Sequence, residues 1–306
     1  MRSRSVEVRR ARPLLGTFVE IVVPEPGPDT AGAIGAAFAE IEEVQRRMSF
    51  HDPASGLSKM NRQAANAAVP VDAWTFEVLQ MAAAVHRVSG GVFDVTIAPR
   101  LQALGFLPGT AGAGTTGSFD DVELTADGCV RFHHPRLRID LGGIAKGFAV
   151  DRAVASLRQA GVESGLVNAG GDLRAFGAAS FPVALRHPAI PGAMLASFPA
   201  RDCAVATSAH YFADRLVSGA GSAPIVHPRG NSEPALAPAL APALARTATV
   251  RASTAMVADA LTKVVMLCAE DALPALAHFG AEAFFVSDAG ELTCSKNWNA
   301  TLHIHS

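Results

Sequence analysis

The spacing of apolar residues in the first third of the chain predicts one strand and two helices. The β-rich run 14–23 predicts a strand, which the Pro/Gly cluster that follows it ends. Apolar residues recur at helical spacing over Thr30–Met48, which predicts an amphipathic helix. The polar segment 49–61 is expected to lead on to a second helix over 72–88.

The rest of the chain alternates between short strands and helices. The Asp127-Gly128 dipeptide between two β-rich runs predicts a hairpin. A strand over 137–141 is expected to pass through two glycines into a helix over about 144–159. The other expected strands are 165–168, 182–186, 194–198, 204–207, 247–252, 283–287 and 301–305, and the other expected helices are 254–268 and about 271–279.

These elements mix without a regular strand–helix–strand period, which favours an α+β fold with mixed, mostly antiparallel sheets and packed helices. A chain of 306 residues is about twice the usual ~150-residue domain, so two lobes or one large domain are expected. Residues 233–245 repeat a Pro-Ala-Leu unit. Proline at every fourth position breaks a helix at each turn, so this segment is predicted to be an extended loop.

Composition and net charge indicate which partners and which location to expect. The chain is 49% hydrophobic with a formal net charge of -2, which gives no reason to expect nucleic acid or an anionic membrane as a partner. No apolar run approaches the ~20 residues of a membrane span, and the first apolar run is too interrupted for a signal peptide. A cytoplasmic, soluble chain is therefore expected. The four cysteines are far apart and are expected to be free thiols.

The segment 139–153, IDLGGIAKGFAVDRA, has the most informative chemistry. A strand ending near Asp140, two glycines and an immediate helix would present backbone N–H groups and a positive helix end to a phosphate or pyrophosphate. Lys146 could neutralise the same phosphates, and Asp140 could accept a hydrogen bond from a ribose hydroxyl or a ring N–H. The segment matches neither the P-loop nor the GxGxxG pattern, and a glycine turn that only packs is the alternative.

Three further carboxylates stand where a ligand could use them. Asp172 follows a strand and two glycines, although turn capping explains it equally well. Asp94 lies between Phe93 and Val95 in what is predicted to be an apolar strand, where a buried carboxylate must bind either a ligand or nearby backbone. Asp259 shares a helix face with Thr262 and Lys263. Asp259 and an oxygen of Thr262 could hold Mg²⁺ with ligand phosphates, or Asp259 could pair with Lys263 alone.

Seven collinear motifs resemble those of the ApbE-type FAD:protein FMN transferases, from about Leu14 to the C-terminus. Any one of them is weak, but their shared order makes the resemblance specific. The motifs are LGTFVEI (15–21), SGLSKMN (55–61), GGVFDVTIAP (90–99), IDLGGIAKGFAVD (139–151), NAGGDL (168–173), AVATSAHY (204–211) and AMVADALT (255–262).

The resemblance implies a single domain over 1–306, with its core at 14–290, and FAD in a cleft between two intertwined lobes. Members of the family cleave the FAD pyrophosphate with Mg²⁺, pass FMN to a Thr or Ser of an acceptor protein, and release AMP. The implied FAD-binding residues are Leu15, Phe93, Asp94, Asp140, Lys146 and Ile225, and the implied metal positions are Gly143, Asp259, Thr262 and Lys263.

The chain departs from the family pattern at two places. Pro224 stands where the family has a histidine thought to assist catalysis, so His227, three residues on, is the candidate catalytic residue, with an uninvolved loop histidine as the alternative. Lys263 stands where the family has a metal-binding threonine. Its ammonium would repel Mg²⁺ or stand in for part of the metal's charge.

These departures leave three functions open. An active transferase is the leading interpretation. A degenerate FAD-binding protein or an FAD pyrophosphatase of the same fold is the second, and an assembly protein whose glycine turns are structural is the third.

Overall fold

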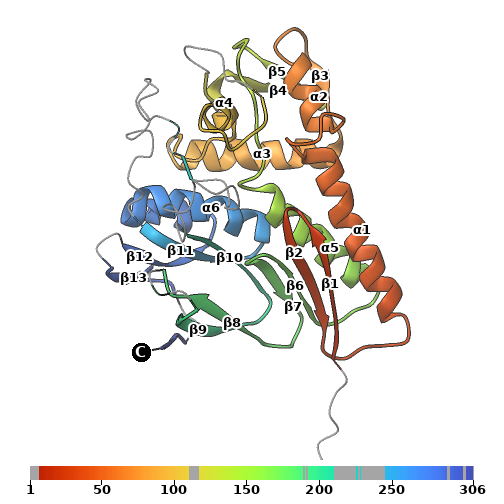
Figure 1. Ribbon diagram of the computed structural model, residues 1–306, viewed down its shortest axis with the longest axis vertical. Helices are drawn as coiled ribbons and strands as arrows, with labels where there is room; N and C mark the ends of the chain where they lie inside the picture. The colour runs from red at the N-terminus through yellow and green to blue at the C-terminus, as the bar shows by residue number, and fades with distance from the viewer. Residues whose placement is uncertain are drawn as a thin grey trace, which may run out of the picture.

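The computed structural model describes residues 7–109, 117–188, 190, 192–209, 225–226, 228, 245–287, 290–298 and 301–305. Its main feature is an eight-stranded sheet in the order β1-β2-β6-β7-β10-β11-β12-β13, with antiparallel neighbours throughout (Figure 1). Its strands are β1 Val8–Leu14, β2 Thr17–Val23, β6 Gly165–Ala169, β7 Asp172–Phe176, β10 Cys203–Ala209, β11 Ala245–Ala252, β12 Glu282–Ser287 and β13 Leu292–Cys294.

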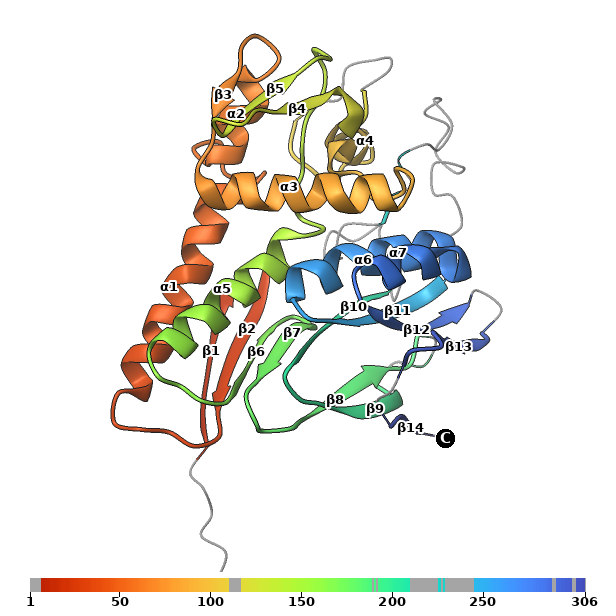
Figure 2. The same cartoon turned by 180° about the vertical axis from the view of Figure 1, so that it is seen from behind.

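Helices and a smaller sheet cover the two faces of this large sheet. Helix α5 (Ala145–Gln159) packs between α1 (Thr30–Met48) and α6 (Ala255–Cys268), and α6 lies over β10 and β11 (Figure 2). The three-stranded sheet β14-β9-β8 packs on the opposite face through a second apolar cluster. Its strands are β8 Phe181–Arg186, β9 Met194–Ala200 and β14 His303–Ile304.

A further layer lies beyond α5 and α6. Helix α3 (Ala73–Val88) contacts α1, α6 and α7 (Leu273–His278), as both views show. Beyond α3 lie the two short helices α2 and α4 and the small sheet β3-β5-β4. Their bounds are α2 Gly56–Gln63, α4 Ala98–Ala103, β3 Val69–Pro70, β4 Val122–Leu124 and β5 Cys129–Phe132. None of the described helices is both long enough and apolar enough to cross a bilayer.

The structure confirms the α+β class, with antiparallel sheets and packed helices. The helix over Thr30–Met48 is confirmed in full, since its buried residues follow the predicted face. The hairpin across Asp127 and Gly128 is confirmed as β4–β5. The polar segment 49–61, where no element was predicted, contains most of α2, which Ser55 caps by accepting from the Ser58 N–H.

The prediction of one strand over 14–23 is wrong because a tight turn divides the run. Leu14 at the end of β1 pairs with Thr17 at the start of β2, and two residues separate them. These are Leu15 (φ 55°) and Gly16 (φ 70°), the positive φ angles that a type I′ hairpin turn requires. Leu15 adopts this conformation without the freedom of a glycine.

The prediction of a strand over 137–141 is also wrong. Leu137, Ile139 and Leu141 are fully buried, so the apolar alternation indicates burial and not strand pairing. The side chain of Asn61 replaces a neighbouring strand. It accepts from the Ile139 N–H (2.8 Å) and donates to the Ile139 carbonyl (2.8 Å). The expected Pro-Ala-Leu loop lies outside the described residues as far as 244, and residue 245 begins β11.

Candidate functional site

The glycine turn that precedes α5 folds back on Asp140. The Asp140 N–H donates to the Val95 carbonyl (2.8 Å), and the Gly142 N–H donates to Oδ1 of Asp140 (3.2 Å). The residue before α5, Ile144, provides no capping side chain. The positive end of the helix dipole lies at this start, as the segment 139–153 predicts, but the N–H groups of Ala145 and Gly147 are already bonded, to the Leu141 carbonyl (2.8 Å) and to Oδ2 of Asp259 (3.1 Å).

Two lysine–aspartate pairs lie beside this helix start, and we refer to the four residues as the lysine–aspartate cluster. Lys146 in the first turn of α5 pairs with Asp172 at the start of β7. Lys263 on α6 pairs with the carboxylate of Asp259 and also donates to the Asp259 carbonyl (2.9 Å). Asp172 and Asp259 are 2% and 0% exposed. The cluster therefore buries two carboxylates, each with its own ammonium partner.

Close contact between α5 and α6 positions the cluster. The Gly147 N–H donates to Oδ2 of Asp259 (3.1 Å). A β-carbon on Gly147 would lie 2.1 Å from the Ala255 carbonyl oxygen, so only glycine permits this approach. Asp151, one turn further along α5, accepts from the N–H groups of Ala255 and Met256 (both 2.9 Å) and thereby caps α6.

Gly143 and Phe93 border the Lys263 side of the cluster. A β-carbon built on Gly143 would lie 3.6 Å from Cε of Lys263 and 3.7 Å from Cε2 of Phe93. Phe93 is 5% exposed. Three residues predicted from separate motifs are therefore neighbours in the fold.

The β1–β2 turn borders the Asp172 side. The Leu15 N–H donates to Oε1 of Gln45 on α1 (2.7 Å), which fixes the turn. Thr17 directly follows the turn, and a β-carbon on Gly170 would lie only 2.5 Å from its Oγ1. Gly170 has a φ of 67° and belongs to the turn that leads into Asp172. The structure thus places the Leu15 turn near the Lys146–Asp172 pair.

Charge and burial set the protonation of the cluster. Loss of hydration would lower the pKa of Lys146, but the carboxylates of Asp172 and Asp259 outweigh it and raise that pKa. Burial alone would raise the pKa of Asp259, but the ammonium groups of Lys263 and Lys146 hold that pKa below its usual value. Burial raises the pKa of Asp172, and the negative charge of Asp259 raises it further. Lys146 and Lys263 lower the same pKa but do not outweigh these two effects. Lys146 and Asp259 are therefore charged at neutral pH.

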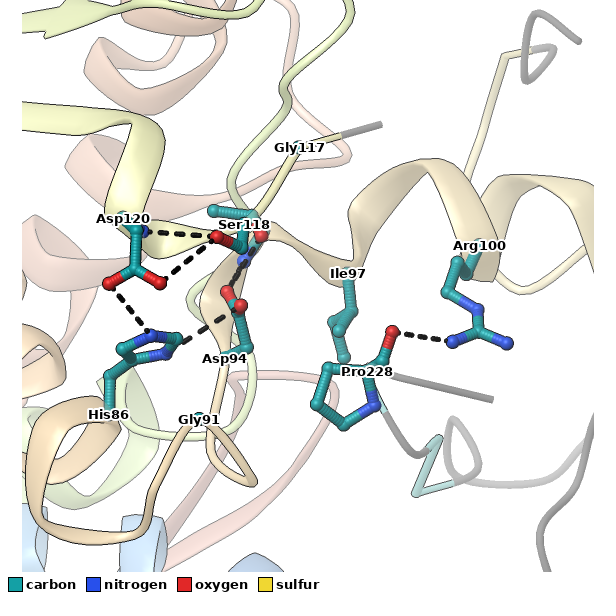
Figure 3. Close-up of a pocket in the computed structure, with 10 residues that line it drawn as sticks. His86, Gly91, Asp94, Ile97, Arg100, Gly117, Ser118, Asp120 and Pro228 are labelled. Atoms are coloured by element: carbon teal, nitrogen blue, oxygen red, sulfur yellow. Dashed lines mark hydrogen bonds and ion pairs between the residues drawn. The ribbon is translucent and has the colours of Figure 1, made fainter. Parts of the chain in front are cut away.

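The prediction of a strand around Asp94 is wrong, because Asp94 caps a 3-10 helix over Val95–Ile97 that leads into α4, and its carboxylate binds local groups. Its Oδ1 accepts from the N–H (2.8 Å) and the hydroxyl (2.7 Å) of Thr96, and its Oδ2 accepts from the Phe119 N–H (3.2 Å). His86 lies between Asp94 and Asp120, with one ring nitrogen 3.6 Å from a carboxylate oxygen of each (Figure 3). The adjoining pocket measures about 110 Å³, well below the ~300 Å³ at which sites for small organic ligands begin.

The remaining predicted residues are placed as follows. Ile225 is partly buried against the main apolar core. Thr262 is fully buried, and its hydroxyl donates to the Asp259 carbonyl (2.7 Å) and also meets the hydroxyl of Ser208 (2.8 Å). The catalytic candidate His227 and the neighbouring Pro224 lie outside the described residues. Their roles stay predictions.

Mg²⁺ needs near-octahedral oxygen coordination, and the cluster as arranged does not provide it. Both carboxylate oxygens of Asp259 are engaged, Oδ1 by Lys263 and Oδ2 by the Gly147 N–H. The oxygen of Thr262 is bonded, as described above. Within the described part of the chain, no group of three or more His, Cys, Asp or Glu side chains is arranged to hold a metal ion. The residues present do not fit the ion that the resemblance implies.

Fold and site together define an α+β protein that gathers two lysine–aspartate pairs beside the start of a helix. The sequence profile of the ApbE family matches residues 15–285, which is most of the chain. This chain belongs to the ApbE family.

The names of two similar proteins state an enzymatic activity. The chain is 30% identical over 242 residues to an FAD:protein FMN transferase of Treponema pallidum (strain Nichols), covering 69% of this chain and 66% of that protein. It is 26% identical over 222 residues to an FAD:protein FMN transferase of Vibrio cholerae serotype O1, covering 67% of this chain and 66% of that protein. The chain thus spans slightly less than two thirds of each relative.

Solved structures agree on the fold. The flavin transferase ApbE from Vibrio cholerae superposes with a TM-score of 0.79 at 21% identity, covering 95% of this chain and 98% of that one. The ApbE protein of Thermotoga maritima superposes with a TM-score of 0.81 at 24% identity, with the same coverage. At these identities the likeness establishes the fold alone.

Two residues that position the cluster were not singled out from the sequence. Gly147 and Asp151 are four residues apart, so they share one helix face, and both contact α6. A glycine and an aspartate at this spacing in the first half of α5 are the available signal. The partner of each residue lies more than 100 positions away in the sequence, which no local pattern reveals.

Proposed function

We propose that this chain is an FAD:protein FMN transferase. The observation that carries the proposal is the convergence of motifs at the start of α5. Phe93, Gly143, Lys146, Asp172 and Asp259 come from four separate motifs, and contacts link them into one site. The names of the relatives support the same activity.

The reaction exchanges one phosphate bond for another. The oxygen of a Thr or Ser hydroxyl on the acceptor protein attacks the FMN phosphorus of FAD. The bond from that phosphorus to the bridging oxygen breaks, its electron pair leaves with AMP, and the hydroxyl proton passes to a base. Lys146, held positive by Asp172 and Asp259, would stabilise the charge that develops on the phosphates. His227 is the base that the sequence offers.

FAD is proposed to lie in a cleft between two intertwined lobes. Its pyrophosphate would meet the positive end of α5, where Asp140 and Lys146 flank the glycine turn. The Leu15 turn and Phe93 border the same place, on opposite sides of the cluster. The resemblance also predicts Mg²⁺, but the described donors do not fit it, so no step of the proposal uses the metal.

Incubation with FAD and a pool of synthetic Thr- and Ser-containing peptides tests the proposal. AMP and FMN are quantified by chromatography, and flavin on the peptides by mass spectrometry, with and without Mg²⁺. We expect AMP together with flavinylated peptide. Lys146→Met should abolish both, whereas Lys296→Met, at an exposed lysine, should match the wild type. Wild-type protein that neither binds nor cleaves FAD would refute the proposal.

The loss of the family's histidine at Pro224 favours a second candidate, an FAD pyrophosphatase or a non-catalytic FAD-binding protein. The same experiment separates these functions. Free FMN and AMP in equal amounts, with no flavinylated peptide, would indicate the pyrophosphatase. Bound FAD without AMP release would indicate a binding protein.

A further inference from the structure

The ammonium of Lys263 lies where the resemblance predicts a divalent cation. It contacts two oxygens of the same residue, the Asp259 carboxylate and, at 2.9 Å, the Asp259 carbonyl. Its Cε would be 3.6 Å from a β-carbon on Gly143. The implied metal ligand Asp259 thus already holds a positive charge that belongs to the chain, and Gly143 lies beside the same side chain.

This pair differs from the usual exposed lysine–aspartate pair on a helix. Asp259 is 0% exposed and the Lys263 side chain is 18% exposed, so water screens their attraction weakly. The Gly147 N–H holds the second carboxylate oxygen from another helix. Asp259 therefore cannot turn toward a metal without losing two partners.

A divalent ion would also meet unfavourable charges. It would have to displace the Lys263 ammonium from Asp259 and remain near two positive side chains, because Lys146 also acts electrostatically on Asp259. Each of the two carboxylates already has one lysine partner. The two ammonium charges thus offset the two carboxylate charges of the cluster without an added cation.

We propose that Lys263 is a built-in cation, so that this site binds the pyrophosphate of a dinucleotide without a divalent metal. The inference rests on the proposed function for its ligand, FAD. Lys263 and Lys146 would donate charge-assisted hydrogen bonds to the phosphate oxygens, since the Lys263 ammonium uses only two of its three N–H groups on Asp259, and the positive end of the α5 dipole lies beside them. The specific prediction is that the affinity for FAD does not depend on Mg²⁺.

The binding test uses the full chain and FAD, followed by flavin fluorescence in EDTA and in millimolar Mg²⁺. The wild type should bind FAD equally in both conditions. Lys263→Met keeps the bulk of the side chain but removes the charge, and it should bind about tenfold or more weakly in EDTA. Lys263→Thr frees the carboxylate of Asp259, so Mg²⁺ should restore much of its affinity. Lys296→Met is the matched control and should not change.

A second measurement does not depend on FAD. Titration of the protein alone with Mn²⁺, followed by electron paramagnetic resonance, should show no tight site in the wild type and a new one in Lys263→Thr. Circular dichroism establishes that each variant is folded. Lys263→Met provides a second variant if the threonine variant unfolds.

Three outcomes overturn the inference. These are wild-type binding of FAD that collapses in EDTA, a Lys263→Met variant that binds FAD as the wild type does, and a tight Mn²⁺ site in the wild type. Absence of FAD binding in every condition would instead refute the proposed function, and the Mn²⁺ titration would still decide whether Lys263 replaces the metal.

Discussion

Replacing Gly147 with alanine tests whether close contact between two helices holds the site together. A β-carbon at this position would lie 2.1 Å from the Ala255 carbonyl oxygen, 2.5 Å from the Ala255 carbonyl carbon and 2.7 Å from the Met256 nitrogen. All three atoms are backbone, so no side chain can rotate away. Helices α5 and α6 must move apart, and the hydrogen bond from the Gly147 N–H to Asp259 is lost or stretched.

The expected loss of stability has three parts. Overpacking of a buried contact costs about 1–3 kcal/mol. Loss of a hydrogen bond to a buried carboxylate adds about 1.5–3 kcal/mol. The better helix propensity of alanine returns up to about 1 kcal/mol. The net loss is therefore roughly 2–5 kcal/mol, which should lower the melting temperature of a 306-residue chain by about 3–8 °C.

The control is Gly35→Ala on α1. Gly35 is also a helical glycine, but a β-carbon there meets no atom within 4 Å. The helix propensity then acts alone and should stabilise the protein by about 0.5–1 kcal/mol. Relative to the wild type, urea unfolding should show a lower free energy of unfolding for Gly147→Ala and a higher one for Gly35→Ala. A Gly147→Ala protein as stable as Gly35→Ala would refute the reasoning, because it would mean that the helices separate at no cost.

Two further predictions concern polar groups away from the cluster. Asn61→Ala should destabilise the protein by about 2–5 kcal/mol in urea unfolding, because it leaves the buried N–H and carbonyl of Ile139 without partners, whereas the exposed Asn66→Ala should change little. Asp72→Asn should cost about 1 kcal/mol at neutral pH, because asparagine can still cap α3 but lacks the charge that binds Arg47. Burial opposes the charge of Asp72, but Thr75 and Arg47 outweigh burial and hold its pKa below the usual value. The stabilisation is therefore present above about pH 4 and fades as the pH falls through the folded-state pKa, so the unfolding curves of the two proteins should converge in acid; a difference independent of pH would contradict this.

The sequence predicts best where burial follows a single periodicity. The spacing of Ile34, Phe38, Ile41 and Val44 marks one face of α1, and that face is buried as expected. The run 137–141 shows the limit of such patterns, since alternation indicates which side chains are buried but not what satisfies the backbone. The partner there is a side chain 78 residues away, which no local pattern identifies.

The sequence predicts residues of the candidate site but not how they pair. Motif order singled out Lys146 and Asp259 as residues of one site, and the structure brings them close enough to influence each other electrostatically. The sequence left open whether Asp259 holds a metal or pairs with Lys263, and the structure shows the pair. The pairing of Lys146 with Asp172 joins a helix to a strand 26 residues later, so it depends on how β7 lies beside α5.

Helix contact and charge make separable contributions to this site. Gly147 and Asp151 fix the position of α6 relative to α5 through backbone groups, and that position determines where the carboxylate of Asp259 lies. Lys263 lies on α6 itself, so removing only its charge leaves the helix contact in place. Gly147→Ala should therefore lower both the stability and the affinity for FAD. Lys263→Met should weaken FAD binding in EDTA, and it should also cost about 3–5 kcal/mol of stability, because it leaves the carboxylate of Asp259 buried without its ammonium partner. Stability therefore does not separate the two residues, but Mg²⁺ does, because Lys263→Thr should regain affinity for FAD when Mg²⁺ is added and Gly147→Ala should not. If Mg²⁺ failed to restore Lys263→Thr, Lys263 would be a structural partner of Asp259 and not the cation of the site.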